Sequence, residues 1–263
     1  MVHRIALFSC ALVLAACVGP IERDLPDGAN ADAVADARAC DRGDVPACSN
    51  LGVRFEAGDG VPIDVDRAEA LYRRACDEGG ELACANLAAL LPERGGSAEE
   101  SIALLEGACS DLAPIPCLRL AEALVARGGR GDAEAAAVHF ARLCDAFVMP
   151  GCVGLGELHE TGALGAVDAH AAAAAFARAC EREFPRGCMG LARLELQRPP
   201  SQRDAEAAVQ RYVMACYAGE ADACAFAADA LAEGDVDLPA DPERATELRA
   251  RACDDGYAPA CTP

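Results

Sequence analysis

Large and small apolar residues recur along the chain in units of about 35 residues. In the first half of each unit an apolar residue is followed directly by a small one: Leu51-Gly52, Leu87-Ala88, Leu120-Ala121, Leu155-Gly156, Leu191-Ala192 and Ala227-Ala228. In the second half a small residue precedes a larger one by four positions: Ala68/Tyr72, Ser101/Leu105, Ala136/Phe140, Ala172/Phe176, Ala208/Tyr212 and Ala245/Arg249. In the last pair the larger residue is charged. Residues four apart lie on one face of a helix. The pattern therefore predicts two short helices per unit, with small residues packed against large ones.

Cysteines mark the boundaries of these units. Of the 16 cysteines, fourteen form seven pairs with C-x7-C spacing: Cys40/Cys48, Cys76/Cys84, Cys109/Cys117, Cys144/Cys152, Cys180/Cys188, Cys216/Cys224 and Cys253/Cys261. Eight residues of continuous helix rise ~12 Å, whereas the Cα atoms of a disulfide lie ~4.4–6.8 Å apart. A bridge within each pair therefore requires the chain to reverse direction between the two cysteines. Four glycines lie three residues after a leading cysteine, where a helix end favours a left-handed residue: Gly43, Gly79, Gly219 and Gly256.

A bridge within each C-x7-C pair is the expected arrangement, because this spacing never varies. Pairing across a hairpin, such as Cys48 with Cys76, is also geometrically possible, although that interval varies from 24 to 28 intervening residues. A zinc site is disfavoured because the spacing is not that of a zinc ribbon or finger and histidines are few.

The starts of both helices of a unit are predicted. The first helix is expected to begin at the trailing cysteine. For the second helix, one N-cap residue precedes the leading cysteine of each repeat at the same distance: Asp64, Ser97, Asp132, Asp168, Asp204 and Asp241. Aspartate and serine are favoured at this position because their side chains accept a hydrogen bond from a free backbone N–H. Variation in length then falls in the loop before the cap, where insertions are tolerated.

Together these elements predict an all-α chain, an α/α solenoid in which helical hairpins form a right-handed superhelix with one disulfide per repeat. The solenoid is expected over residues 29–263, as a lone helix over 29–41 followed by about six hairpins. The last repeat has no first helix of its own, so an exposed terminal face is expected there.

The unit from Ala47 to Cys76 reads ACSNLGVRFEAGDGVPIDVDRAEALYRRAC. It resembles the Sel-one-like repeat, a relative of the tetratricopeptide repeat, and the C-x7-C pairs resemble those of its cysteine-rich Hcp branch. The resemblance implies a concave ligand face formed by the first helices and a role in protein–protein interaction. Members of the Hcp branch are described as penicillin-binding proteins or weak β-lactamases. This implies an alternative function as a hydrolase, with a β-lactam or a peptidoglycan fragment as the ligand, but no catalytic motif transfers to this chain.

The candidate ligand-binding residues lie at the second and fifth positions after a trailing cysteine, which share one helix face. They include Asn50, Asn86, Arg119, Glu122, Glu157 and Arg193. Their mixed charge favours an extended peptide over an apolar small molecule, and a solvated face is the other interpretation. His159 holds the position that Phe55 has in the first repeat, as a groove ligand or base or as a polar replacement of a packing aromatic.

Composition excludes several kinds of chemistry. All 23 basic residues are arginine, and without lysine there is no P-loop lysine, Schiff base or Ser-x-x-Lys acylase. A formal net charge of −20 argues against nucleic acid, whose phosphates need a basic surface. The acidic loops lack EF-hand spacing, so capping and solvation are favoured over calcium. No cofactor, metal or catalytic residue is predicted.

The N-terminus predicts export. Residues 5–14 form an apolar run after Arg4 that is too short to span a bilayer and is typical of a signal peptide. The sequence Leu14-Ala15-Ala16-Cys17 resembles the lipobox of bacterial lipoproteins. This implies a signal peptide over 1–16, lipidation at Cys17 and a tether over 17–28. Val18 after the cysteine favours the outer membrane.

The expected protein is thus lipid-anchored to the bacterial envelope, with a protein or peptide of the envelope as its partner and membrane contact only through the lipid. An ordinary secretory signal, which would leave a secreted or periplasmic soluble protein, is the alternative.

Overall fold

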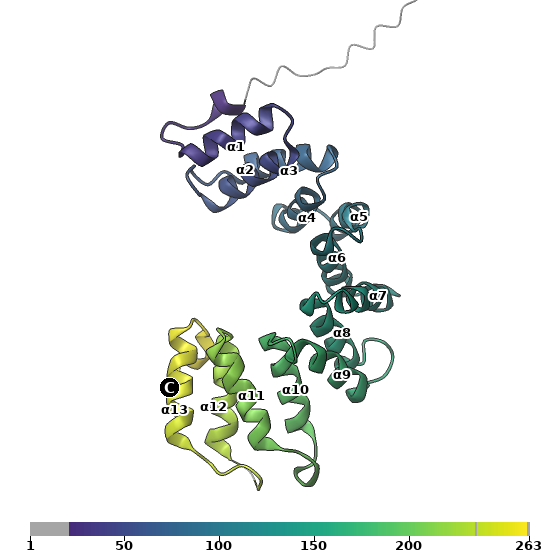
Figure 1. Ribbon diagram of the computed structural model, residues 1–263, viewed down its shortest axis with the longest axis vertical. Helices are drawn as coiled ribbons and strands as arrows, with labels where there is room; N and C mark the ends of the chain where they lie inside the picture. The colour runs from purple at the N-terminus through teal and green to yellow at the C-terminus, as the bar shows by residue number, and fades with distance from the viewer. Residues whose placement is uncertain (1–20, 235, 262–263) are drawn as a thin grey trace, which may run out of the picture. The chain divides into compact units, whose positions relative to one another are not determined.

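The computed structural model describes residues 21–234 and 236–261 (Figure 1). The predicted signal peptide and the predicted lipidation site at Cys17 lie outside these ranges. Within them the chain forms thirteen α-helices and no β-strand: α1 (Ala31–Asp41), α2 (Val45–Ala57), α3 (Val65–Asp77), α4 (Glu81–Leu90), α5 (Ala98–Ala108), α6 (Pro114–Arg127), α7 (Asp132–Asp145), α8 (Met149–Thr161), α9 (Ala169–Cys180), α10 (Pro185–Gln197), α11 (Ala205–Tyr217), α12 (Ala221–Glu233) and α13 (Pro242–Asp254). Short 3-10 helices cover Ile21–Asp24, Pro92–Arg94, Pro200–Gln202 and Ala258–Cys261. None of the helices in the described ranges has the length and apolar character needed to cross a membrane.

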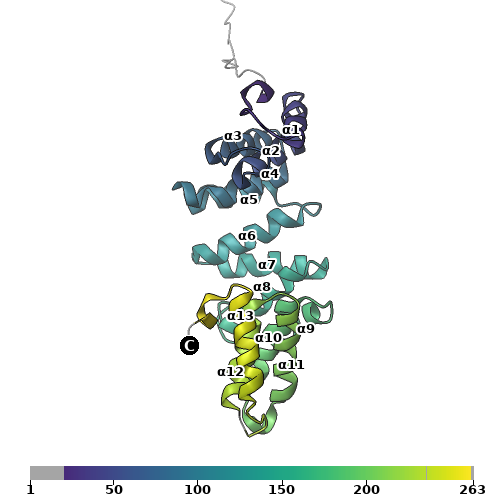
Figure 2. The ribbon, with the colours of Figure 1, turned by 90° about the vertical axis from the view of Figure 1, so that its left-hand side faces the viewer.

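The chain divides into two compact units, which meet in sequence at Leu90 and Leu91. Within each unit every helix packs against the next one along the chain, α1 to α4 in the first and α5 to α13 in the second (Figures 1 and 2). The first helices of successive repeats also touch, α2 with α4, α6 with α8 and α8 with α10. This nearest-neighbour packing is that of a solenoid of helical hairpins. The predicted fold class is confirmed.

All seven predicted disulfides join the two cysteines of one C-x7-C pair, with Cα atoms 4.6 to 4.9 Å apart. They are Cys40–Cys48, Cys76–Cys84, Cys109–Cys117, Cys144–Cys152, Cys180–Cys188, Cys216–Cys224 and Cys253–Cys261. The alternative pairing across a hairpin does not form. The chain reverses as expected, with a left-handed residue three positions after the leading cysteine in six of the seven described loops: Gly43, Gly79, Phe147, Glu183, Gly219 and Gly256. Only the loop after Cys109 is built differently.

The prediction that each first helix begins at its trailing cysteine is wrong by three residues. Helix α10 begins at Pro185, so Cys188 lies inside its first turn, and α2, α4, α6, α8 and α12 show the same offset. The reversal after the leading cysteine takes only a few residues, and the helix resumes directly after it. Proline is favoured in a first turn, where its missing N–H costs no hydrogen bond. Four of these helices have proline there, at Pro46, Pro114, Pro150 and Pro185.

Five of the six predicted N-caps are confirmed. In each, the side chain accepts a hydrogen bond from the backbone N–H three residues on: Asp64, Ser97, Asp168, Asp204 and Asp241. The prediction for Asp132 is wrong, because α7 begins one residue earlier and Gly131 occupies the cap. The Asp132 carboxylate instead accepts from the Gly129 N–H at 2.7 Å and pairs with Arg127 at 2.7 Å. These contacts direct it back toward α6 instead of into its own helix.

The predicted packing of large residues against small ones is present in both units. A Cβ atom added to Gly52 would lie 2.6 Å from the Tyr72 ring, and one added to Gly156 would lie 2.6 Å from the Phe176 ring. Contacts below 3.0 Å are not tolerated between carbon atoms, so the ring occupies the space that a side chain would need. These glycines set how closely the helices approach.

The last part of the predicted tether is folded. From Ile21 to Asp24 the chain forms a 3-10 helix. The Asp41 carboxylate accepts hydrogen bonds from the N–H groups of Ile21 and Glu22, at 2.9 and 3.1 Å. Glu22 in turn pairs with Arg38 at 2.7 Å. The segment is therefore held against the C-terminal part of α1, and the tether expected over 17–28 differs from the structure from Ile21 onward.

Candidate functional site

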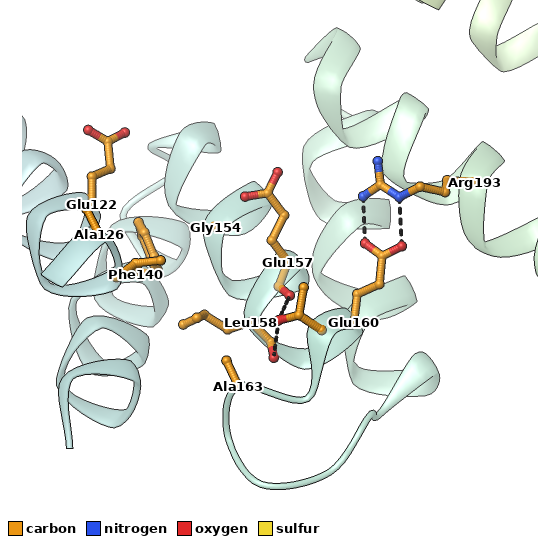
Figure 3. A pocket seen from close by; sticks show the side chains of 11 residues that line it. Glu122, Ala126, Phe140, Gly154, Glu157, Leu158, Glu160, Ala163 and Arg193 are labelled. Atoms are coloured by element: carbon orange, nitrogen blue, oxygen red, sulfur yellow. Dashed lines mark hydrogen bonds and ion pairs between the residues drawn. The ribbon is translucent and has the colours of Figure 1, made fainter. Parts of the chain in front are cut away.

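A hollow of about 640 Å³ opens along the first helices of the second unit (Figure 3). Its walls come from α6, α8 and α10, with one residue each from α7 and from the loop after α8. The lining residues are Glu122, Val125, Ala126, Phe140, Gly154, Glu157, Leu158, Glu160, Thr161, Ala163 and Arg193. First helices, which the repeat resemblance implies as the ligand face, therefore form most of this surface.

The repeat pattern explains why the hollow forms here. The second position after the trailing cysteine of α8 is Gly154, so no side chain fills the face between α6 and α8. A Cβ atom at Gly154 would lie 2.6 Å from the Phe140 ring, which instead approaches the backbone of α8. Phe140 and Leu158 are buried and form an apolar floor. Val125, which is 44% exposed, extends that apolar surface toward the rim.

Three of the six predicted ligand residues line this hollow. Glu122, Glu157 and Arg193 each stand five positions after a trailing cysteine, on α6, α8 and α10. Arg119 lies one turn before Glu122 on α6 and outside the lining.

The other two predicted residues belong to the first unit. Asn50 is exposed on α2, and Asn86 is half-buried on α4. The six residues predicted to share one face are thus divided between the two units, with two in the first and four in the second. What the structure brings together is the part on α6, α8 and α10.

The two carboxylates at the rim are shifted toward their neutral forms. Glu157 is exposed at the rim. Desolvation by the helices beside it raises the pKa of its carboxyl group, Arg193 and Arg186 oppose this shift, and Glu160 and Glu122 add to it. Glu122 is also exposed, and desolvation by its surroundings raises its pKa, with Arg119 opposing the shift. Figure 3 shows the two side chains extended to the same side of their helices. Neither forms an ion pair with any residue in the described ranges.

Arg193 forms an ion pair with Glu160 on the neighbouring helix. Its Nε and Nη2 atoms donate to the two carboxylate oxygens of Glu160, at 2.7 and 2.6 Å, which joins α10 to α8. This bidentate geometry is the strong form of an arginine–carboxylate contact, and the hydrogen bond raises the pKa of Arg193. The guanidinium also lies over the Phe176 ring, 5.8 Å from its centroid. With Arg193 neutralised, the negative charge left at the rim is that of Glu122 and Glu157.

Glu160 is the polar residue of this site that sequence reasoning missed. It lies one turn after Glu157, and its side chain is only 12% exposed. The signal available was its separation from Arg193, 33 residues, which is close to one repeat. Opposite charges one repeat apart on first helices come together when the helices stack.

The lining of the hollow combines apolar surface with charged side chains and contains no serine. Among its lining residues the one hydroxyl, that of Thr161, donates to the Glu157 carbonyl oxygen at 2.8 Å. The lining contains neither histidine nor cysteine. His159 is half-buried outside it, so its interpretation as a groove base gains no support. Carboxylates above an apolar floor suit recognition of a cationic, partly apolar group.

Comparisons with known proteins agree with this architecture. Residues 45–80, 150–183 and 221–257 match the Sel1 repeat family, and these segments span the α2–α3, α8–α9 and α12–α13 hairpins. The fold is similar to that of a Sel1 repeat protein from Oxalobacter formigenes, with a TM-score of 0.68 and 16% identity over 85% of this chain and 97% of that one. It is also similar to an immunity protein from Pseudomonas aeruginosa, with a TM-score of 0.55 and 18% identity over 90% and 86%.

Identities this low show the fold alone, and no protein of curated function matches the chain in sequence. The narrower resemblance to the Hcp branch stays a prediction. Three segments of the chain therefore match the Sel1 repeat family, and the chain has the helical-hairpin solenoid fold of Sel1 repeat proteins.

Proposed function

We propose that the chain is an exported, lipid-anchored scaffold that binds a protein of the cell envelope through the hollow on α6, α8 and α10. The observation that carries the proposal is the pairing of an apolar floor with two carboxylates that have no ion-pair partner among the described residues. An extended segment of the partner lies along the first helices and places one arginine or lysine side chain in the hollow.

The chemistry of the hollow selects that side chain. The methylene stem of arginine or lysine packs on apolar surface while its charged end reaches an anion, and Phe140, Leu158 and Val125 provide such a surface below Glu122 and Glu157. Both side chains are exposed at the rim, and desolvation by the helices beside them raises the pKa of each carboxylate. A cation that binds between them relieves this cost, so the free protein is prepared for a positive ligand.

The charge of the whole chain acts in the same direction. A formal net charge of −20 attracts basic partners over long range and raises their association rate. The fold supports a binding role, because repeat solenoids offer extended surfaces to their ligands. One of the similar structures is that of an immunity protein.

Binding is expected to follow the charge of a single peptide side chain. On an array of 12-residue peptides that each carry one arginine, the oxidised protein should bind a subset, and it should lose roughly tenfold in affinity when that arginine is replaced by glutamine. Glu157→Gln should remove most of this preference, and Glu122→Gln should reduce it. Glu134→Gln, an exposed change on α7 away from the hollow, is the matched control.

Lowering the pH should weaken this binding already at pH values at which an ordinary glutamate is still ionised. The reason is that the pKa values of Glu122 and Glu157 both lie above the usual range. Equal affinity for the arginine and glutamine arrays, or an effect of Glu134→Gln as large as that of Glu157→Gln, would contradict the proposed recognition.

The anchor is tested separately from the hollow. Cells that express the full-length chain should incorporate labelled palmitate into it and retain it in the membrane fraction, because a multiply acylated terminus holds a soluble body firmly. The Cys17→Ser variant should lose the label and move to the soluble fraction. A wild-type protein without label would rule out the anchor and leave the peptide-binding proposal standing.

A further inference from the structure

The third disulfide loop differs from the other six that the structure describes. Helix α5 ends at Ala108, so Cys109 stands outside the helix with extended backbone angles of φ −73° and ψ 110°. In the other loops the leading cysteine lies within its helix. Leu112 does not adopt the left-handed conformation found at this position elsewhere, and an isolated bridge between Ser110 and Ala113 closes the loop. Cys109 is therefore less constrained by its backbone than the other leading cysteines.

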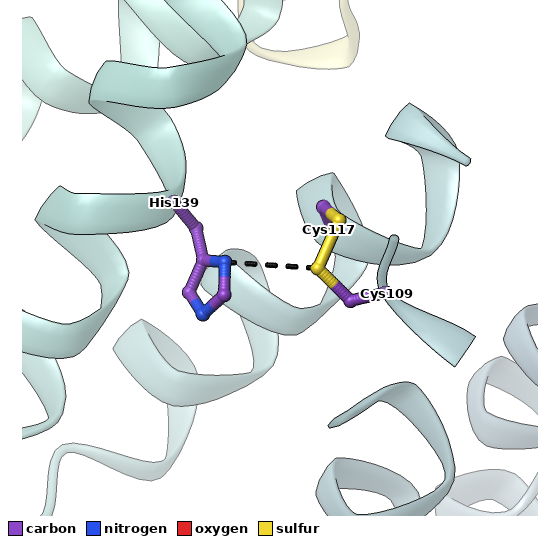
Figure 4. Close-up of side chains that lie close together, drawn as sticks. All are labelled: Cys109, Cys117 and His139. Atoms are coloured by element: carbon purple, nitrogen blue, oxygen red, sulfur yellow. Dashed lines mark hydrogen bonds between the residues drawn. A yellow bond between two sulfur atoms is a disulfide. The ribbon is translucent and has the colours of Figure 1, made fainter. Parts of the chain in front are cut away.

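A histidine from the next helix lies beside this disulfide. His139 on α7 has its Nδ1 atom 3.7 Å from the Cys109 Sγ atom (Figure 4). In the described ranges this is the one place where a histidine nitrogen and two cysteine sulfurs lie within 4.8 Å of one another. The charged groups that act on His139 are Arg142 on its own helix and Glu106 on α5. Burial and Arg142 lower the pKa of His139, with Glu106 opposing them, which favours the neutral imidazole.

The second cysteine of the pair, which is 8% exposed, faces a small cavity. The cavity has a volume of about 60 Å³, and both Cys117 and His139 line it. Asp111 and Arg142, which form an ion pair with each other, lie at its edge. By contrast, both cysteines are fully buried in the pairs Cys40–Cys48, Cys144–Cys152 and Cys216–Cys224. Cys117 lines this cavity and Cys109 does not, although Cys109 is the more exposed of the two residues. The sulfur that the His139 Nδ1 atom approaches is that of Cys109.

We propose that Cys109–Cys117 is a site of thiol–disulfide exchange, at which a small thiol becomes joined to Cys117 while His139 stabilises the departing sulfur of Cys109. The substrate class is a low-molecular-weight thiol in its thiolate form. The site is separate from the hollow on α6, α8 and α10, and the proposal does not depend on the binding function.

The atoms and charges of the step balance. The thiolate sulfur attacks Cys117 Sγ, a new sulfur–sulfur bond forms there, and the bond to Cys109 Sγ breaks with its electron pair left on Cys109. His139 takes one proton from solvent and pairs as an imidazolium with the Cys109 thiolate. A departing thiol leaves faster when its thiolate is stabilised, and a neighbouring imidazolium is an established means of doing so. A second thiol that attacks the mixed disulfide returns both cysteines to the reduced state.

The test uses the full oxidised chain and reduced glutathione as the probe. At successive times free thiols are alkylated in acid-quenched samples, and peptide mass spectrometry gives the opening rate of each disulfide in the same sample. Cys76–Cys84 is the internal reference, since its cysteines match Cys109 and Cys117 in burial, one half-buried and one 8% exposed. The variants are His139→Gln and His139→Phe.

The ratio of the Cys109–Cys117 rate to the Cys76–Cys84 rate should fall roughly tenfold in both variants. Glutathione should be found on Cys117. A substitution that merely loosened α7 would open the bond faster, so destabilisation cannot imitate the expected slowing. An unchanged ratio in both variants, or glutathione attached to Cys109 instead of Cys117, would overturn the proposal.

Discussion

Phe176→Ala is expected to lower the free energy of unfolding of the second unit by about 3–5 kcal/mol, the usual range for a fully buried phenylalanine. Phe176 is fully buried on α9. Its ring fills the space that side chains at Gly156 on α8 and Gly190 on α10 would need, because a Cβ atom at either glycine would lie 2.6 Å from it. Helices that meet at glycines around one ring cannot collapse into the cavity left when that ring is removed.

Urea unfolding of the oxidised protein, followed by circular dichroism, measures the change. Phe226→Ala is the matched control: Phe226 also lies in the second unit and touches an aromatic ring, that of Tyr212, but it is 39% exposed. Its loss should cost clearly less. Similar losses for the two variants would mean that the ring between the two glycines is not the main contact joining α8, α9 and α10. The same ring supports Arg193 at the hollow, so Phe176→Ala should also weaken peptide binding.

Removing the Cys144–Cys152 disulfide by double substitution to alanine is expected to destabilise the second unit by more than about 2.5 kcal/mol, because the loss of two buried sulfur atoms adds to the chain-entropy value for a loop of this size. Both cysteines are fully buried, and the bridge joins the end of α7 to the start of α8. These two helices provide the floor and one wall of the hollow. The loss of stability should therefore appear in the part of the chain that carries the candidate site.

The Cys253–Cys261 pair provides a control of equal loop length. Cys261 is exposed and lies in the terminal 3-10 helix, so removing this bridge frees few packed residues and should cost less. Thermal unfolding of the two double variants and of the wild type under non-reducing conditions measures how much stability each variant has lost. A terminal variant that loses as much as the internal one would show that the effect comes from the unfolded chain alone.

Much of the fold could be predicted from the sequence because every repeat carries the same pattern of residues. Leu51 with Gly52, an N-cap such as Asp64 and a C-x7-C pair each carry a weak local signal, but their recurrence in register fixes two helices and one reversal per unit. The same register placed Glu122, Glu157 and Arg193 on one side of neighbouring first helices, and all three line the hollow.

What the sequence did not reveal depends on contacts between residues far apart. Asp132 looks like the other caps, and only its contacts with Gly129 and Arg127 show that it serves a different purpose. The segment from Ile21 has the composition of a linker, yet Asp41, about 20 residues later, binds its backbone. The hollow depends on the side chain that Gly154 lacks, and a pattern of large and polar residues does not report empty space.

The strictly local disulfides have a consequence for how the chain acquires them. If cysteines are oxidised in the order in which they cross a membrane, each leading cysteine meets its native partner as the next thiol to arrive, and no reshuffling is needed. Oxidation in this order gives the native disulfides only if Cys40 is the first free thiol to arrive. A free thiol at Cys17 would capture Cys40 and shift every later pairing by one, so that Cys48 would meet Cys76. Acylation of Cys17, as proposed here, would thus protect the pairing of the whole solenoid as well as anchor it.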